Sequence, residues 1–131
     1  MEISVIIPIF NEEDNIRLLH ERLVNTVSAI SNEYELIFVN DGSKDKSLII
    51  IKELAAKFPQ VKYIDFSKNF GHQIAVFAGL EHAKGKAIVI IDADLQDPPE
   101  LIRDLYNKLQ QGYDVVIILV MHRAASENVH N

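Results

Sequence analysis

Residues 87–94 read Ala87-Ile88-Val89-Ile90-Ile91-Asp92-Ala93-Asp94, and this stretch decides the fold class. Its first five residues are apolar without any polar alternation, a pattern typical of a strand that is buried on both faces. Such strands occur in mostly parallel sheets, because the crossover helices cover both faces. The stretch therefore predicts an interior strand of an α/β fold that ends in two aspartates separated by one residue.

Other apolar runs have the same character and alternate with segments of helical periodicity. Strands are predicted at 3–7, where Pro8 ends the run, and at 36–39, 61–66 and 114–120. Helices are predicted over 16–30, 46–58 and 73–83, and from Pro98 to the Gln111-Gly112 pair. Helices of this length between strands imply parallel pairing with right-handed crossovers. We therefore expect a Rossmann-like α/β unit with a mostly parallel sheet and helices on both faces.

Two acidic segments carry signals for helix starts. Asn11-Glu12-Glu13-Asp14 places negative charge where a helix N-terminus favours it, and we assign Glu13 and Asp14 to that role. Asp97-Pro98-Pro99-Glu100 matches a capping box with proline at the first helical position. Asp97 is therefore predicted to cap the fourth helix rather than to bind a ligand.

The composition is that of a globular domain and excludes several classes of site. Of the 131 residues, 48% are hydrophobic, which suits one compact domain over residues 1–123 with a flexible tail over 124–131. The net charge of -6 disfavours nucleic acid, and the absence of cysteine excludes disulfides and thiolate chemistry. There is no basic leader, and the longest apolar stretch, 115–121, is too short to span a membrane. We therefore expect a cytoplasmic location.

In such a sheet, ligands bind beyond the carboxyl ends of the strands, near the point where the strand order reverses. The sequence has neither the glycines of a dinucleotide fingerprint after the first strand nor a Gly-Lys-Ser/Thr phosphate loop. Asp92 and Asp94 suit Mg²⁺ or Mn²⁺ bridging to a diphosphate. The opposing interpretation is that aspartates after strands only form turns, and for Asp41 before Gly42 the two interpretations are evenly balanced. The five histidines show no metal-ligand spacing and are expected at the surface, with only His72 near the site.

Four segments carry a resemblance to a known family. They are Val5-Ile6-Ile7-Pro8-Ile9-Phe10-Asn11-Glu12-Glu13, Val39-Asn40-Asp41-Gly42-Ser43-Lys44-Asp45, Ser67-Lys68-Asn69-Phe70-Gly71 and Asp92-Ala93-Asp94-Leu95-Gln96-Asp97-Pro98-Pro99-Glu100. Together they resemble family 2 glycosyltransferases, inverting enzymes of the GT-A fold, and within them the dolichol-phosphate mannosyltransferase and polyprenyl-phosphate glucosyltransferase group. The resemblance implies a nucleotide-sugar site formed by Pro8, Asn11, Glu12, Asp41 and Asp92. It also implies a metal held by Asp92, Asp94 and Gln96, with Asp94 supporting the leaving diphosphate through that metal.

The resemblance further implies a UDP- or GDP-linked sugar donor, Mg²⁺ or Mn²⁺ as cofactor, and transfer with inversion to a polyprenyl phosphate or glycan acceptor. Such transfer belongs to cell-envelope or lipid-linked sugar synthesis, at the cytoplasmic face of a membrane in a full-length protein. Family members continue for many residues past the fifth strand, so we expect this chain to correspond to their N-terminal, donor-binding part.

Two alternative functions remain open from the sequence. The first is a nucleotide-sugar-binding module without transfer activity. The second is a receiver-like signalling domain, which needs a phosphoacceptor after the third strand and a lysine after the fifth, yet no lysine follows the fifth strand.

Overall fold

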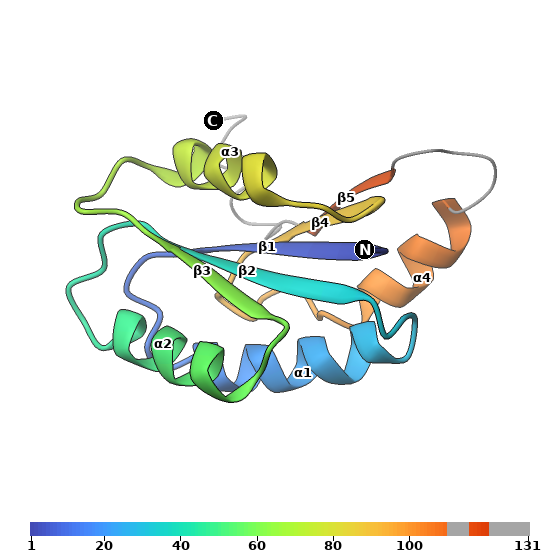
Figure 1. Ribbon diagram of the computed structural model, residues 1–131, viewed down its shortest axis with the longest axis horizontal. Helices are drawn as coiled ribbons and strands as arrows, with labels where there is room; N and C mark the ends of the chain where they lie inside the picture. The colour runs from blue at the N-terminus through green and yellow to red at the C-terminus, as the bar shows by residue number, and fades with distance from the viewer. Residues whose placement is uncertain (110–115, 121–131) are drawn as a thin grey trace.

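The computed structural model describes residues 1–109 and 116–120, which form one parallel sheet with helices on both faces (Figure 1). The strands are β1 (Ile3–Ile9), β2 (Tyr34–Asn40), β3 (Val61–Asp65), β4 (Ala87–Ile91) and β5 (Val116–Val120). The helices are α1 (Ile16–Ser28), α2 (Ser47–Lys57), α3 (His72–His82) and α4 (Leu101–Leu109). The predicted α/β class is confirmed.

The sheet has the strand order β3-β2-β1-β4-β5, and every neighbouring pair is parallel. The order reverses between β1 and β4, which makes the crevice at their carboxyl ends the topological switch point. A receiver-like domain has the order 2-1-3-4-5 instead. The topology therefore excludes the receiver-like alternative.

Two apolar layers hold the helices to the sheet. Of the described helices, α1, α2 and α4 cover one face of the sheet and α3 covers the other (Figure 1). Successive residues of a strand point to opposite faces, so Val5 and Ile7 pack in the larger cluster while Ile6 packs in the smaller one beside Ala75 of α3. Every residue of β1 and β2 is buried, which explains why these strands show no polar alternation.

Strand β1 runs through Pro8 to Ile9, so the prediction that Pro8 ends this strand is wrong. Pairing of β1 with β4 stops at Ile6 opposite Ile90, whereas pairing with β2 continues to Ile9 opposite Asn40. Proline has no N–H to donate to a ladder. It is tolerated here because β1 has a neighbour on one side only at that position.

Helix α4 begins at Leu101, three residues later than the sequence predicted, so Asp97 does not cap it. The N–H of Leu101 binds the carbonyl of Pro98 at 3.1 Å, which makes a turn ahead of the helix. The Glu100 carboxylate binds the Arg22 guanidinium at 2.6 and 3.1 Å instead of closing a capping box.

Helix α1 begins at Ile16 and has no acidic residue in its first turn, so the helix-start role assigned to Glu13 and Asp14 is also wrong. The Glu13 carboxylate accepts the backbone N–H of Lys46 at 3.0 Å, and the Glu13 N–H donates to Asp45 at 3.1 Å. Glu13 therefore links the loop after β1 to the start of α2.

His20 is buried in α1, which contradicts the expectation that the histidines lie at the surface. Its side chain is 5% exposed and its ring lies 4.5 Å from that of Phe58. Within the part of the chain that the structure describes, its Nε2 has no hydrogen-bond partner. Burial lowers the pKa of His20, and the nearby charge of Glu21 opposes this only in part.

Some predictions concern residues outside those described: the fifth strand at 114–115, the helix end at Gln111-Gly112, the domain end at residue 123 and the tail over 124–131. Within the described ranges, no helix has the length and apolar character needed to cross a membrane.

Candidate functional site

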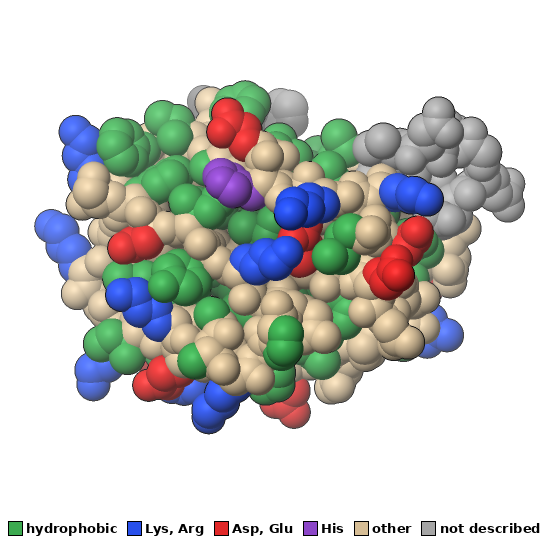
Figure 2. Space-filling model, in the orientation of Figure 1, with side chains coloured by type: hydrophobic (Ala, Val, Ile, Leu, Met, Phe, Trp, Pro, Cys, Tyr) green, Lys and Arg blue, Asp and Glu red, His purple; other side chains and the backbone are tan. Residues whose placement is uncertain are grey.

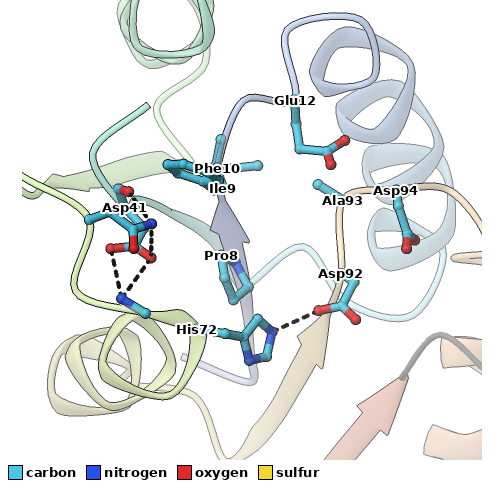
Figure 3. A pocket seen from close by; sticks show the side chains of 11 residues that line it. Pro8, Ile9, Phe10, Glu12, Asp41, His72, Asp92, Ala93 and Asp94 are labelled. Atoms are coloured by element: carbon cyan, nitrogen blue, oxygen red, sulfur yellow. Dashed lines mark hydrogen bonds and ion pairs between the residues drawn. The ribbon is translucent and has the colours of Figure 1, made fainter. Parts of the chain in front are cut away.

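A cavity of about 460 Å³ lies at the carboxyl ends of β1, β2 and β4, over the switch point. The loops after four strands contribute to its lining, as Figure 3 shows. Its polar or charged lining residues are Glu12 after β1, Asp41 after β2, Asn69 and His72 after β3, and Asp92 and Asp94 after β4. Pro8, Ile9, Phe10, Gly71 and Ala93 complete the lining.

The cavity brings together five of the seven predicted site residues. Pro8, Glu12, Asp41, Asp92 and Asp94 line it. Asn11 and Gln96 are exposed and are not among its lining residues.

Asn11 connects two loops at the edge of the cavity. Its backbone N–H donates to the Ser43 hydroxyl at 2.9 Å, and its side-chain oxygen accepts the N–H of Lys44 at 2.8 Å. Its φ of 54° is left-handed, a conformation that asparagine tolerates better than most residues. These contacts fix the loop after β1 against the loop after β2.

Glu12 is held from both ends. Its N–H donates to the Ser47 hydroxyl at 2.9 Å, and its carboxylate accepts the Asn15 amide at 2.8 Å. In Figure 3 it lies on the same side of the cavity as Asp92 and Asp94, with Asp41 on the opposite side. Negative charge therefore gathers on one wall, which would repel a free diphosphate and attract a cation.

Asp41 is 3% exposed, and its carboxylate is surrounded by hydrogen-bond donors from the loop after β3. It accepts the N–H of Phe70 at 2.7 Å, the N–H of Gly71 at 3.1 and 3.3 Å, and the Asn69 amide at 3.1 Å. A buried carboxylate is stable only when it is bonded in this way. Asp41 therefore shapes the local backbone and also lines the cavity, so the two interpretations of this residue are compatible.

Gly42 is required where these two loops meet. Its φ is +71°, and a Cβ at this position would lie 2.4 Å from the backbone N of Asn69 and from the backbone carbon of Lys68. Only glycine permits both the conformation and the close approach.

Asp92 and Asp94 differ in their surroundings although one residue separates them. The Asp92 carboxylate lies 2.9 Å from Nε2 of His72. The Asp94 carboxylate accepts the N–H of Gln96 at 3.1 Å across a turn in which Leu95 has a φ of 60°. Asp94 thus forms a turn, as expected from the interpretation that aspartates after strands are turn formers.

The carboxylates of Asp92 and Asp94 are oxygen donors of the kind that a hard divalent cation takes. Among residues 1–109 and 116–120, no group of three or more His, Cys, Asp or Glu side chains is placed to hold a metal ion. Two carboxylates are nonetheless enough for Mg²⁺, which usually keeps several waters and completes its shell with substrate phosphates.

The contributions of Asn69 and Gly71 were missed in the sequence analysis, although both lie within a segment that it singled out. Gly71 has a φ of +107° directly before α3. An Asn-Phe-Gly turn before a helix was the available signal. What the sequence did not show is that Asp41 binds this turn.

Comparisons with known proteins agree on one family. The family described as Glycosyl transferase family 2 matches residues 4–129. The chain is 52% identical to "Uncharacterized glycosyltransferase YkcC" of Bacillus subtilis, over 88% of this chain and 36% of the relative. It is 46% identical to the "Prophage bactoprenol glucosyl transferase homolog" of Escherichia coli, over 89% of this chain and 38% of the relative. The chain thus spans little more than a third of the length of these relatives.

Solved structures of similar fold include residues 1–349 of TarS from S. aureus. This structure is 26% identical with a TM-score of 0.64, and the match covers 85% of this chain and 33% of the TarS chain. The same TarS region in complex with UDP-GlcNAc also has a TM-score of 0.64.

Proposed function

The chain belongs to glycosyl transferase family 2, and we propose that it forms the donor-binding part of an enzyme that transfers a sugar from UDP to a polyprenyl phosphate. The observation that carries the proposal is the cavity at the switch point, with Asp92 and Asp94 on one wall and Asp41 on the other. A TarS structure that holds UDP-GlcNAc supports a UDP-linked donor over a GDP-linked one. Relatives named bactoprenol glucosyl transferase support the acceptor.

Each predicted residue keeps a distinct role in this proposal. Pro8, Glu12 and Asp41 would contact the nucleoside from three sides of the cavity, while Asn11 would hold the loop that carries Glu12. Asp92 would contact both the diphosphate and the cation.

We propose Mg²⁺ or Mn²⁺ as the cofactor, bound by Asp92 and Asp94, with Gln96 as a further oxygen ligand from the following turn. When bound, the ion would neutralise the diphosphate and stabilise the charge on departing UDP. The negative wall of the cavity supports such a cation as the partner of an anionic donor, because the described residues that line the cavity include no lysine or arginine.

The transfer would proceed with inversion in a single displacement. An oxygen of the acceptor phosphate forms a bond to C1 of the sugar, and the bond between C1 and the UDP oxygen breaks with its electron pair leaving on UDP. The acceptor phosphate is already an anion, so no side chain has to remove a proton from it. This chemistry does not require a general base among the residues that line the cavity.

The test is a thermal-shift series with UDP-glucose and GDP-mannose, each in Mn²⁺ or in EDTA. UDP-glucose with Mn²⁺ should stabilise the fold by about 2.7 kcal/mol when present at about a hundred times its Kd. EDTA, Asp92→Asn and Asp94→Asn should each remove this effect, whereas Asp104→Asn, at an exposed position on α4, should not. Equal stabilisation in EDTA contradicts the metal-dependent site, and stabilisation by neither donor contradicts donor binding.

A second candidate is a donor-binding module that does not transfer sugar by itself. The observation that favours it is the match to only 36% to 38% of the relatives' length. Incubation of the purified chain with UDP-[¹⁴C]glucose and a polyprenyl phosphate tests this second candidate, because the formation of labelled lipid would contradict a module that does not transfer sugar by itself.

A further inference from the structure

A second cavity, of about 310 Å³, lies beside the first, between α3 and the β4–β5 side of the sheet. Val76 and Phe77 of α3 form one wall. Ile90 of β4 and Leu119 and Val120 of β5 form the other. Its lining is therefore predominantly apolar, whereas the lining of the first cavity includes four carboxylates.

Among the described residues, α3 packs mainly over β1 and β2, and no other described helix lies over the β4–β5 part of the same face. Phe77 is 63% exposed, Leu119 57% and Ile117 56%. Hydrophobic side chains are visible at the surface over α3 in Figure 2. Contiguous exposed apolar surface beside a cavity is typical of a binding site.

The two cavities are joined by shared residues, since His72 and Asp92 line both of them. Among the described residues that line the two cavities, His72 is the only lysine, arginine or histidine. Its ring is 55% exposed and lies 2.9 Å from Asp92, on the boundary between the acidic and the apolar cavity. A ligand that suits this arrangement has an apolar chain and an anionic end.

We propose that the apolar cavity binds the isoprenoid chain of the polyprenyl phosphate acceptor, with the phosphate beside His72. This inference rests on the proposed function. In that function the nucleoside lies over β1 and β2, so the sugar extends toward β4, the strand that both cavities share. The acceptor phosphate would then approach the sugar from the β5 side, away from the departing UDP.

The inference is tested by isothermal titration of the whole chain with geranyl phosphate below its aggregation concentration. Geraniol and inorganic phosphate serve as separate probes for the apolar and anionic ends. Phe77→Ser and Leu119→Thr change exposed side chains at the cavity, and Leu18→Ser is the matched control because Leu18 is 49% exposed on α1, on the opposite face. His72→Gln tests the anionic end.

Geranyl phosphate should bind the unmodified chain more tightly than either partial probe. Phe77→Ser and Leu119→Thr should each weaken it about tenfold, the change expected from losing contact with one large apolar side chain. Leu18→Ser should not weaken it. His72→Gln should weaken geranyl phosphate but not geraniol. The affinity for UDP with Mn²⁺ should stay unchanged in the Phe77 and Leu119 variants.

Three results would overturn the inference while leaving the donor site intact. They are equal affinity in the Phe77, Leu119 and Leu18 variants, displacement of geranyl phosphate by UDP with Mn²⁺, and no geranyl phosphate binding by a chain that binds UDP. Analytical ultracentrifugation tests a fourth result. If the unmodified chain is a dimer and the Phe77→Ser and Leu119→Thr variants are monomers, a second copy of the chain covers this face and the inference is overturned. Binding of geranyl phosphate without any binding of UDP would contradict the proposed function instead.

Discussion

The carboxylate of Asp41 accepts the backbone N–H of Phe70 at 2.7 Å, which ties the end of β2 to the turn that starts α3. The next N–H, that of Gly71, binds the same carboxylate. His72 follows directly and reaches Asp92 after β4. One buried carboxylate thus sets the position of a turn that lines the first cavity.

Replacing Asp41 with Asn should lower the free energy of unfolding by about 2 kcal/mol, because an amide nitrogen would face N–H donors and leave them unsatisfied in a buried site. Urea denaturation at pH 7 measures this change. Asp14→Asn is the control, since Asp14 is exposed. Equal stability of the Asp41 and Asp14 variants would show that the bonds to Phe70 and Gly71 contribute nothing.

Glu35 is a second buried carboxylate, at the opposite end of β2 from the cavities. Its side chain is 1% exposed and lies 2.8 Å from the Lys62 ammonium. It also accepts the Ser4 hydroxyl at 2.6 Å and the N–H of Lys84 at 2.8 Å. Burial alone would raise the pKa of Glu35, but these hydrogen bonds outweigh it and hold the pKa below its usual value.

The lowered pKa of Glu35 predicts acid sensitivity. The unfolded chain binds a proton at this carboxyl near its ordinary pKa of about 4.3, whereas the folded chain does so only at lower pH. The stabilisation is therefore present at neutral pH and is lost as the pH falls below about 4.3 through the folded pKa. Glu35→Gln should cost about 2 kcal/mol at pH 7 and much less near pH 3. Urea melts across this range, with Glu81→Gln as an exposed control, measure the difference. A constant difference between pH 7 and pH 3 would contradict the assignment.

His20 predicts a different pH dependence. Because its folded pKa lies below that of the unfolded chain, the unfolded state gains a proton first as the pH falls below about 6.5. Stability should therefore decrease from pH 7 to pH 5. His20→Leu removes both this titration and the unsatisfied Nε2, so it should raise the unfolding free energy by about 1 kcal/mol at pH 7 and by more at pH 5. His82→Leu, at an exposed position, is the control, and an identical slope in His20→Leu and the unmodified chain would rule the explanation out.

The fold was predictable wherever short-range patterns determine the structure. The prediction of β4 over 87–91 is confirmed to the residue, because five apolar residues stand between polar neighbours. The prediction of β2 began at Leu36, but the strand includes Glu35. A glutamate inside a buried strand is stable here through Lys62 and Ser4, which lie on other strands, and through the backbone N–H of Lys84. No local pattern carries that information.

The site was predictable in part for the same reason. Ligands of parallel sheets bind beyond the carboxyl ends of the strands, and this rule correctly predicted that Asp92 and Asp94 line one cavity. It did not locate the donors that surround Asp41, because they come from residues 69–71 of another loop. His20 was placed at the surface by residue type, although it follows Leu19 and lies one helical turn after Ile16, at the border of the apolar stripe.

Asp94 and Asp97 stand three residues apart, and the structure predicts that only the first matters for the proposed cation. Asp94→Asn retains an oxygen that can accept the N–H of Gln96, so the turn after β4 should still form. The variant lacks one charged oxygen ligand, so Mn²⁺ affinity in the presence of UDP should fall at least about tenfold. Asp97→Ala should leave that affinity unchanged. It should also cost far less than the roughly 1 kcal/mol of a true N-cap, because α4 begins only at Leu101. Mn²⁺ titration and urea melts of both variants test the contrast. The assignment fails if Asp97→Ala loses Mn²⁺ affinity while Asp94→Asn keeps it.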